Sequence, residues 1–306
     1  MFCLAGVESL KSGGEILKSS KGIFYVVLSS LSFGIMPILA KLAYSREMTT
    51  YAVLFLRFSL AAIMLFCYLI LRKISFRLNK KQIFMVIILG VFGYSATALS
   101  LFISYRYISA GLATNIMYIY PIIVTVLSFF IYKDKFTFTK IIALLLCIIG
   151  VFIMAGKISG SFNLKGIIFA LMSSGFYSFY VMGISHSEIK KINSYLMTFY
   201  LSIISGIIMF IMGEATHTMN LSLITPYSFV CVLLLAFIST VVALMAFLKG
   251  VKLIGPANAS ILSTLEPVAS LILGWLILKE NITFRIALGC IFILISVFVL
   301  SKKSQY

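Results

Sequence analysis

The chain has 306 residues, of which 62% are hydrophobic and only 11% are charged, and its formal net charge is +17. Soluble domains are nearer half apolar and a quarter charged, so this composition predicts an integral membrane protein. The positive charge does not indicate a nucleic-acid partner, because the basic residues lie in short segments between long apolar runs.

Ten apolar runs are each long enough, or nearly so, to cross a hydrocarbon core of about 30 Å as a helix. We place them at residues 22–44, 50–72, 82–104, 109–132, 137–155, 165–186, 194–213, 226–249, 256–278 and 283–301. The connections are short, and no soluble domain fits into them. The sequence therefore predicts an all-α membrane protein with ten transmembrane helices.

Lysine and arginine predict the orientation in the membrane, since cytoplasmic loops carry an excess of both. With a cytoplasmic N-terminus, the inner segments hold 17 of the 25 basic residues and the outer loops hold 6. The segment 72–81 alone holds five of them. We expect a multi-pass protein of the plasma or inner membrane, with cytoplasmic tails at residues 1–21 and 302–306.

The chain contains an internal duplication. A shift of 146 residues aligns 105–154 with 251–300 without a gap, and 11 of the 50 pairs are identical. Because apolar composition alone produces some identities, three landmarks carry the argument: the pairs Pro121 and Pro267, Lys133-Asp134 and Lys279-Glu280, and Thr137-Phe138 and Thr283-Phe284. A shift of 144 residues extends the match back to the start of the first helix.

The duplication predicts two halves of five helices, at residues 22–155 and 165–301. Because five crossings is an odd number, the second half enters the membrane from the opposite side. The halves are therefore expected to form an inverted-topology repeat, an architecture that recurs among secondary transporters.

Ten helices in two halves, Glu266-Pro267, and the Lys279-Glu280 that precedes the last helix resemble the EamA branch of the drug/metabolite transporter superfamily. The resemblance covers nearly the whole chain. It implies a carrier for small metabolites, in which the fourth, fifth, ninth and tenth helices pack between halves or between protomers, so a homodimer is one expected arrangement. The first half departs from the pattern, because Tyr120 precedes Pro121 where the second half has Glu266.

Glu266 is the acidic residue expected inside a membrane helix, about 15 Å from the start of the run 256–278. A carboxylate at this depth requires a protein or water neighbour, so it is a candidate cargo contact or proton-titrating group. The alternative is a structural acid that hydrogen-bonds a neighbouring helix. Pro267 and its equivalent Pro121 are expected to kink their helices, and both are candidate hinges.

Arg57 lies in the outer half of the second helix. It either extends to the headgroups or faces the interior as a counter-charge to a carboxylate. Uncharged polar residues form stripes on four further helices, and these stripes predict a shared polar cavity. The candidate substrate-binding residues among them are Tyr94, Asn115, Tyr118, Tyr177, Tyr180 and Asn258. Small and hydroxyl residues in such stripes have an alternative role in helix packing.

No nucleotide-binding, hydrolase or metal-ligand motif occurs in the sequence, so neither enzymatic activity nor a cofactor or metal is expected. The partners expected are a small-molecule substrate and the lipid bilayer. The sequence thus predicts an ATP-independent secondary transporter working by alternating access. Its cargo is expected to be an amino acid or a related compound, because one acid, amides and tyrosines suit a compact zwitterion. The alternatives are an exporter of drugs or organic cations that uses Glu266 as counter-charge, and a membrane enzyme or non-transporting membrane protein.

Overall fold

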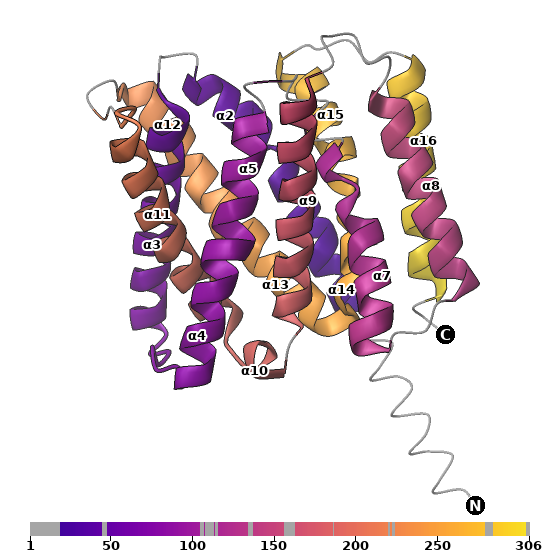
Figure 1. Ribbon diagram of the computed structural model, residues 1–306, viewed down its shortest axis with the longest axis horizontal. Coiled ribbons are helices and arrows are strands. Elements are labelled where there is room, and N and C mark those ends of the chain that lie inside the picture. The colour runs from indigo at the N-terminus through magenta and orange to yellow at the C-terminus, as the bar shows by residue number, and fades with distance from the viewer. Residues whose placement is uncertain are drawn as a thin grey trace, which may run out of the picture.

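The computed structural model describes residues 19–44, 48–104, 107, 113, 116–133, 137–155, 163–185, 187–219, 221, 224–278 and 284–303. Within these ranges all regular structure is helical and no strand occurs, which confirms the all-α prediction. Most of the helices run along one common direction, side by side (Figure 1).

The first half of the chain begins with a helical segment at residues 19–34. It continues with α2 (Met36–Tyr44), α3 (Thr50–Leu71), α4 (Lys80–Ile88), η1 (Leu89–Ser95), α5 (Ala96–Ser104), α7 (Tyr120–Tyr132) and α8 (Phe138–Ala155). The second half comprises α9 (Leu164–Ile184), α10 (Ser187–Lys190), α11 (Ser194–Ala215), α12 (Pro226–Leu234), η2 (Leu235–Val242), α13 (Ala243–Ile254), α14 (Pro256–Leu262), α15 (Leu265–Leu278) and α16 (Phe284–Lys303).

Five helical stretches are long and apolar enough to cross a membrane. They are Thr50–Leu71, Lys80–Leu101, Leu164–Ile184, Ser194–Ala215 and Pro226–Ile254. The shorter apolar helices are Tyr120–Tyr132, Phe138–Gly150 and Ala287–Val299. The protein is therefore a multi-pass membrane protein.

Side-chain caps set the starts of several helices. Asn79 accepts a hydrogen bond from the Gln82 N–H at 2.8 Å, and the Gln82 side chain accepts one from the Asn79 N–H at 3.1 Å. This reciprocal capping box satisfies two N–H groups that the first turn of α4 leaves without partners. Thr49, Asn163, Asn193 and Thr225 cap α3, α9, α11 and α12 more simply, each through a side chain that accepts a hydrogen bond from a backbone N–H of the first turn.

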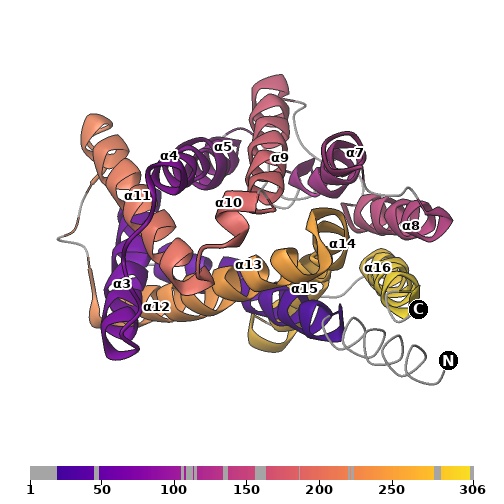
Figure 2. The ribbon, with the colours of Figure 1, turned by 90° about the horizontal axis from the view of Figure 1, so that it is seen from below.

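Packing joins helices from opposite halves of the chain. The largest interface lies between α8 and α16, which stand together at one side of the molecule, and the next between α3 and α11 (Figure 2). Glycine permits the close approach in the first pair, because a Cβ added to Gly150 would lie 2.8 Å from the Gly289 carbonyl oxygen. The other large interface between halves joins α5 to α9.

The third and eighth predicted helices each contain a π-helical segment, which the sequence analysis did not foresee. The segments are η1 (Leu89–Ser95) and η2 (Leu235–Val242). Leu235 lies 146 residues after Leu89, the same shift that aligns the two prolines. A π-turn widens the helix locally and is frequent at functional sites.

Candidate functional site

The site is built around the break between α14 and α15. The sequence predicted one continuous helix over 256–278 with Glu266-Pro267 in its interior, and this was wrong. The helix ends at Leu262, a turn follows, and α15 begins at Leu265. The Glu266 N–H donates to the Ser263 carbonyl at 3.0 Å, so this carbonyl is not left free as the kink would have required. Proline supplies no N–H, and a tighter turn of i to i−3 bonds takes the place of the helical ladder.

The break places Glu266 in the first turn of a helix. There the positive end of the helix dipole favours a carboxylate. Transporters use such discontinuous helices to form binding sites within the membrane.

The equivalent proline in the first half stands at a similar break. Residues 118 and 119 form a turn, and α7 begins at Tyr120 with Pro121 in its first turn. The Ile122 N–H donates to the Ile119 carbonyl at 3.0 Å, again an i to i−3 bond. Both prolines therefore mark helix starts, and neither is a kink within a continuous helix.

Residues of the opposite half contact each break. Tyr118 lies beside Glu266 and interacts with its carboxylate. In the opposite direction, the Tyr120 hydroxyl is hydrogen-bonded to the Ser263 hydroxyl in the turn before α15. Glu266 remains partly exposed, whereas Tyr120 is 2% exposed. The site prediction omitted Tyr120, although its equivalence to Glu266 was a signal for it.

Five tyrosine rings form a continuous wall beside Glu266. The ring centroids are 6.1 Å apart for Tyr118 and Tyr120, 4.7 Å for Tyr120 and Tyr177, 5.9 Å for Tyr177 and Tyr180, and 5.6 Å for Tyr180 and Tyr94. Phe58 extends the wall, with its centroid 5.6 Å from that of Tyr94. The rings come from η1, the turn before α7, α7 itself and α9. Four of the predicted tyrosines are thus brought together.

Arg57 stands next to Phe58 at the far end of this wall. It is 6% exposed, so it does not extend to the headgroups. Its Nε donates to Thr240 Oγ1 at 2.7 Å and its Nη2 to the Ser239 carbonyl at 3.1 Å. Both partners belong to η2, so the π-helical segment holds the guanidinium in place. Arg57 interacts electrostatically with Glu266 and with Tyr94.

Of the two amide side chains predicted to bind substrate, the structure describes one. Asn258 lies on α14, where its Nδ2 donates to the Ile254 carbonyl at 3.0 Å. Its Oδ1 is buried and has no hydrogen-bond partner among the described residues. Asn115 lies outside the described residues.

Several hydroxyls of the predicted polar stripes serve helix packing. Ser104 Oγ donates to the Gly166 carbonyl at 2.8 Å, and Ser173 Oγ donates to the Thr97 carbonyl at 3.0 Å. These bonds join α5 to α9. Thr97 Oγ1 itself donates to the Gly93 carbonyl one turn earlier, at 2.6 Å. This part of the stripe therefore stabilises the contact between the halves.

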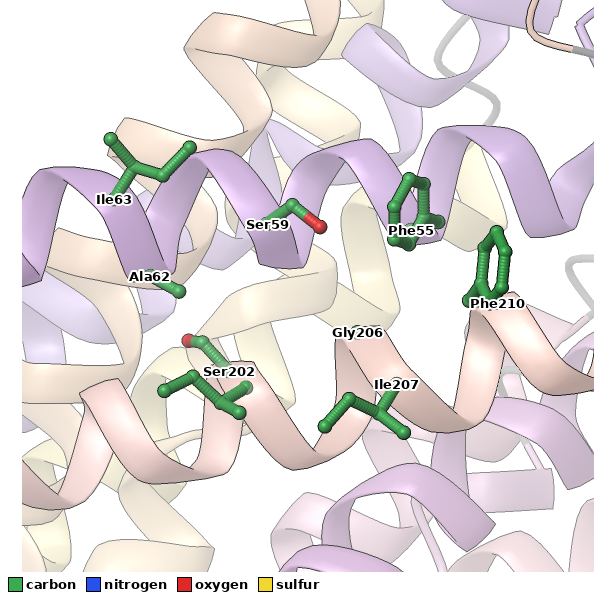
Figure 3. Close-up of a pocket in the computed structure, with 9 residues that line it drawn as sticks. Phe55, Ser59, Ala62, Ile63, Ser202, Gly206, Ile207 and Phe210 are labelled. Carbon is green, nitrogen blue, oxygen red and sulfur yellow. The ribbon is translucent and has the colours of Figure 1, made fainter.

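A separate groove lies between α3 and α11 and has a volume of about 430 Å³ (Figure 3). Phe55, Ser59, Ala62 and Ile63 of α3 face Ser202, Ile203, Gly206, Ile207 and Phe210 of α11. A Cβ added to Gly206 would find its nearest neighbour, Ser59 Oγ, at 3.6 Å, so the helices do not close on each other here. None of the residues around Glu266 lines this groove.

The described residues contain no group of three or more His, Cys, Asp or Glu side chains that could hold a metal ion. The arrangement offers instead one carboxylate, one guanidinium and a wall of aromatic rings within a bundle of apolar helices. Charged and polar groups buried within such a bundle are typical of a membrane transporter.

Comparison with known proteins identifies the class. The EamA-like transporter family matches residues 20–156 and 164–302, and the chain belongs to this family. An uncharacterized transporter of Archaeoglobus fulgidus is 24% identical over 84% of this chain and 91% of its own length. The uncharacterized transporter YetK of Bacillus subtilis is 25% identical over 96% and 91% of the two chains. The uncharacterized inner membrane transporter YicL of Salmonella typhimurium is 26% identical over 74% and 76%.

One solved crystal structure superimposes with a TM-score of 0.80 at 12% identity, covering 94% of this chain and 99% of the other. At this identity the likeness concerns the fold alone. The protein is thus a membrane transporter of the EamA-like family. It lies in a lipid bilayer and has a small-molecule substrate.

Proposed function

We propose that this protein is a secondary transporter that moves a small metabolite, an amino acid or a related compound, without ATP. The observation that carries the proposal is Glu266, a half-buried acidic residue at a helix break inside the bundle, beside a wall of tyrosines. A carboxylate in a membrane protein interior is costly, and its usual roles are in substrate or ion pathways. The cargo site comprises Glu266, Arg57, Tyr94, Tyr118, Tyr177, Tyr180, Asn258 and Asn115.

Alternating access between two inverted halves fits the placement of the irregular segments. The breaks before Pro121 and Pro267 and the π-helical segments η1 and η2 each recur after 146 residues. Equivalent helices also form the main interfaces, α3 with α11 and α8 with α16. If the halves are five-helix repeats at 22–155 and 165–301, they can exchange roles between outward- and inward-facing states of similar energy. The exposed apolar flanks of α8 and α16 are where a second protomer would pack.

We place both termini in the cytoplasm. The segment 72–81, which carries five of the 25 basic residues, lies at the same end of the molecule as α10 (Figure 1). This end faces the cytoplasm under the positive-inside rule. A cysteine introduced at exposed Arg77 should stay unlabelled by an impermeant reagent outside intact cells, and one at exposed Glu214 should react. The opposite pattern would reverse the orientation.

A second candidate function is export of organic cations, with Glu266 as counter-charge. The tyrosine wall favours this alternative, because aromatic faces attract cations within about 6 Å of the ring centroid. A cationic cargo leaves Arg57 without a direct role.

Uptake into vesicles without ATP tests the proposal, with wild type and Glu266→Gln compared in the presence and absence of a pH gradient. If Glu266 contacts the cargo directly, glutamine weakens transport at every pH. If it alternates between cargo and proton, glutamine abolishes the response to the gradient and leaves exchange of cargo for cargo partly intact. Equal rates for both proteins in both conditions would remove Glu266 from the mechanism.

A further inference from the structure

We propose that Arg57 and Glu266 are the two charged ends of a single binding site for a zwitterion. Arg57 binds the carboxylate of the cargo and Glu266 binds its ammonium group. This inference rests on the proposed transport of a small metabolite, and it decides between the amino-acid and organic-cation alternatives.

The two charges are close enough to interact but do not pair with each other. Arg57 belongs to α3 in the first half of the chain, and Glu266 belongs to α15 in the second half. They interact electrostatically, yet they form no ion pair, and neither has another oppositely charged partner among the described residues. Opposite charges left unpaired inside a membrane protein are costly. A cargo with both charges, bound between them, offsets this cost.

Arg57 retains N–H donors for a carboxylate. A guanidinium has five N–H donors, and three of them point to Thr240 Oγ1, the Ser239 carbonyl and, at 3.0 Å, Met36 Sδ. One N–H therefore remains on each terminal nitrogen, which is the number that a carboxylate accepts in a bidentate pair. The bonds to η2 fix the plane of the guanidinium and lower the entropy lost when the cargo binds.

The tyrosine wall connects the two charges. It runs from Phe58, whose ring centroid lies 5.3 Å from the Arg57 guanidinium, to Tyr118, which lies beside Glu266. Within the wall the Tyr180 hydroxyl is buried and has no hydrogen-bond partner among the described residues. Buried hydroxyls are normally satisfied, so this one is available to a bound solute. The rings provide apolar surface for the side chain of the cargo.

The competing explanation gives Arg57 a structural role only. Its three bonds would then serve to hold α3 against η2, and the cargo would be a cation attracted by Glu266. The two explanations differ in one measurable respect. A structural arginine does not distinguish cargoes by their charge, whereas a carboxylate-binding arginine does.

Three ligands that share one side chain and differ in charge separate the explanations. We would use phenylalanine as the zwitterion, phenylalaninamide as the cation and N-acetylphenylalanine as the anion. Affinity is measured from the thermal stabilisation of the purified full-length protein. Wild type should bind phenylalanine at least about tenfold more tightly than either analogue, because each analogue loses one charge-assisted interaction.

Each variant should abolish a different one of these two preferences. Arg57→Gln should lose the preference for phenylalanine over phenylalaninamide, and Glu266→Gln should lose the preference for phenylalanine over N-acetylphenylalanine. Arg57→Lys keeps the charge and removes the bidentate geometry, so it should weaken phenylalanine binding by a smaller factor and leave phenylalaninamide binding unchanged. If Arg57→Gln does not fold, Arg57→Lys still distinguishes a carboxylate-binding Arg57 from a structural one.

Two results would overturn the inference. The first is an equal loss of affinity for phenylalanine and phenylalaninamide in the Arg57 variants, which would make Arg57 structural. The second is a wild-type protein that binds phenylalaninamide best or binds none of the three. Neither result touches the proposed transport function, which fails separately if vesicles show no ATP-independent uptake of any solute.

Discussion

The two helix breaks occupy equivalent places in the chain but carry different chemistry. Before Pro121 stands Tyr120, which is buried and hydrogen-bonded to Ser263. Before Pro267 stands Glu266, which is half-buried and lies beside Tyr118. Each break is thus held by the other half of the chain, through contacts that nearly mirror each other.

The difference shows how a duplicated architecture acquires a single polarised site. Two equivalent breaks provide two helix starts inside the membrane, each with backbone N–H groups that favour negative charge. The carboxylate occupies one of them, and a neutral hydroxyl fixes the other. A second carboxylate at position 120 would place two like charges close together, and one of them would resist ionisation. The asymmetry therefore leaves a single carboxylate at the two breaks.

The largest expected effect comes from removing the prolines. Alanine at position 267 or 121 restores a backbone N–H and favours a continuous helix across the break, at a gain of up to about 3 kcal/mol in helix propensity. The substitution then closes a break that the proposed outward- and inward-facing states both require. We expect Pro267→Ala to slow vesicle uptake about tenfold or more while expression stays within about twofold of wild type.

Pro121→Ala should slow uptake less, because the first break carries no charge. In this variant the first break also retains the hydrogen bond between Tyr120 and Ser263. Comparison of the two variants in the same vesicle assay measures the difference between the breaks directly. Normal uptake by both would reduce the prolines to packing features.

A smaller effect is expected from the hydrogen-bonded pair Tyr120 and Ser263, which joins the two breaks. Tyr120→Phe leaves the buried Ser263 hydroxyl with one partner fewer, and Ser263→Ala does the same to the Tyr120 hydroxyl. Each change should lower the free energy of unfolding by about 1 to 2 kcal/mol. The double variant should lose less than the sum of the two single losses, because the two residues share one bond. Thermal unfolding in detergent measures all three, and strict additivity would show that the bond contributes nothing to stability.

The tyrosines that lie together beside Glu266 were easier to predict from the sequence than the backbone that positions them. Helical spacing placed Tyr94, Tyr177 and Tyr180 on inward faces, because polar side chains avoid lipid. The break before Pro267 was missed, because a proline predicts the loss of one hydrogen bond but not whether the preceding residues leave the helix. The π-helical segments have no signature in the sequence. For that reason the anchoring of Arg57 by Ser239 and Thr240 was also unforeseen.

The smallest effect, and a control for the others, is expected at Glu188 on α10, outside the membrane-spanning segments. Its carboxylate accepts a hydrogen bond from Lys191 Nζ at 2.8 Å, and this bond, together with one from Asn79, lowers the pKa of Glu188 below its usual value. A lowered pKa in the folded state means that the stabilisation is complete above the ordinary pKa and is lost only as the pH falls through the lowered one.

Glu188 therefore stays ionised throughout the range of a transport assay, between about pH 6 and 8. Glu188→Gln removes the same charge as Glu266→Gln, at the end of the molecule that carries α10 and away from the cargo site. We expect its uptake, measured at several pH values, to follow the wild-type pH profile with a change of less than about twofold, since exposed ion pairs contribute little. Any pH dependence that Glu266→Gln abolishes and Glu188→Gln preserves can then be assigned to the break before Pro267. A pH profile altered equally by both variants would contradict that assignment, because the response would then follow the loss of a carboxylate anywhere in the protein.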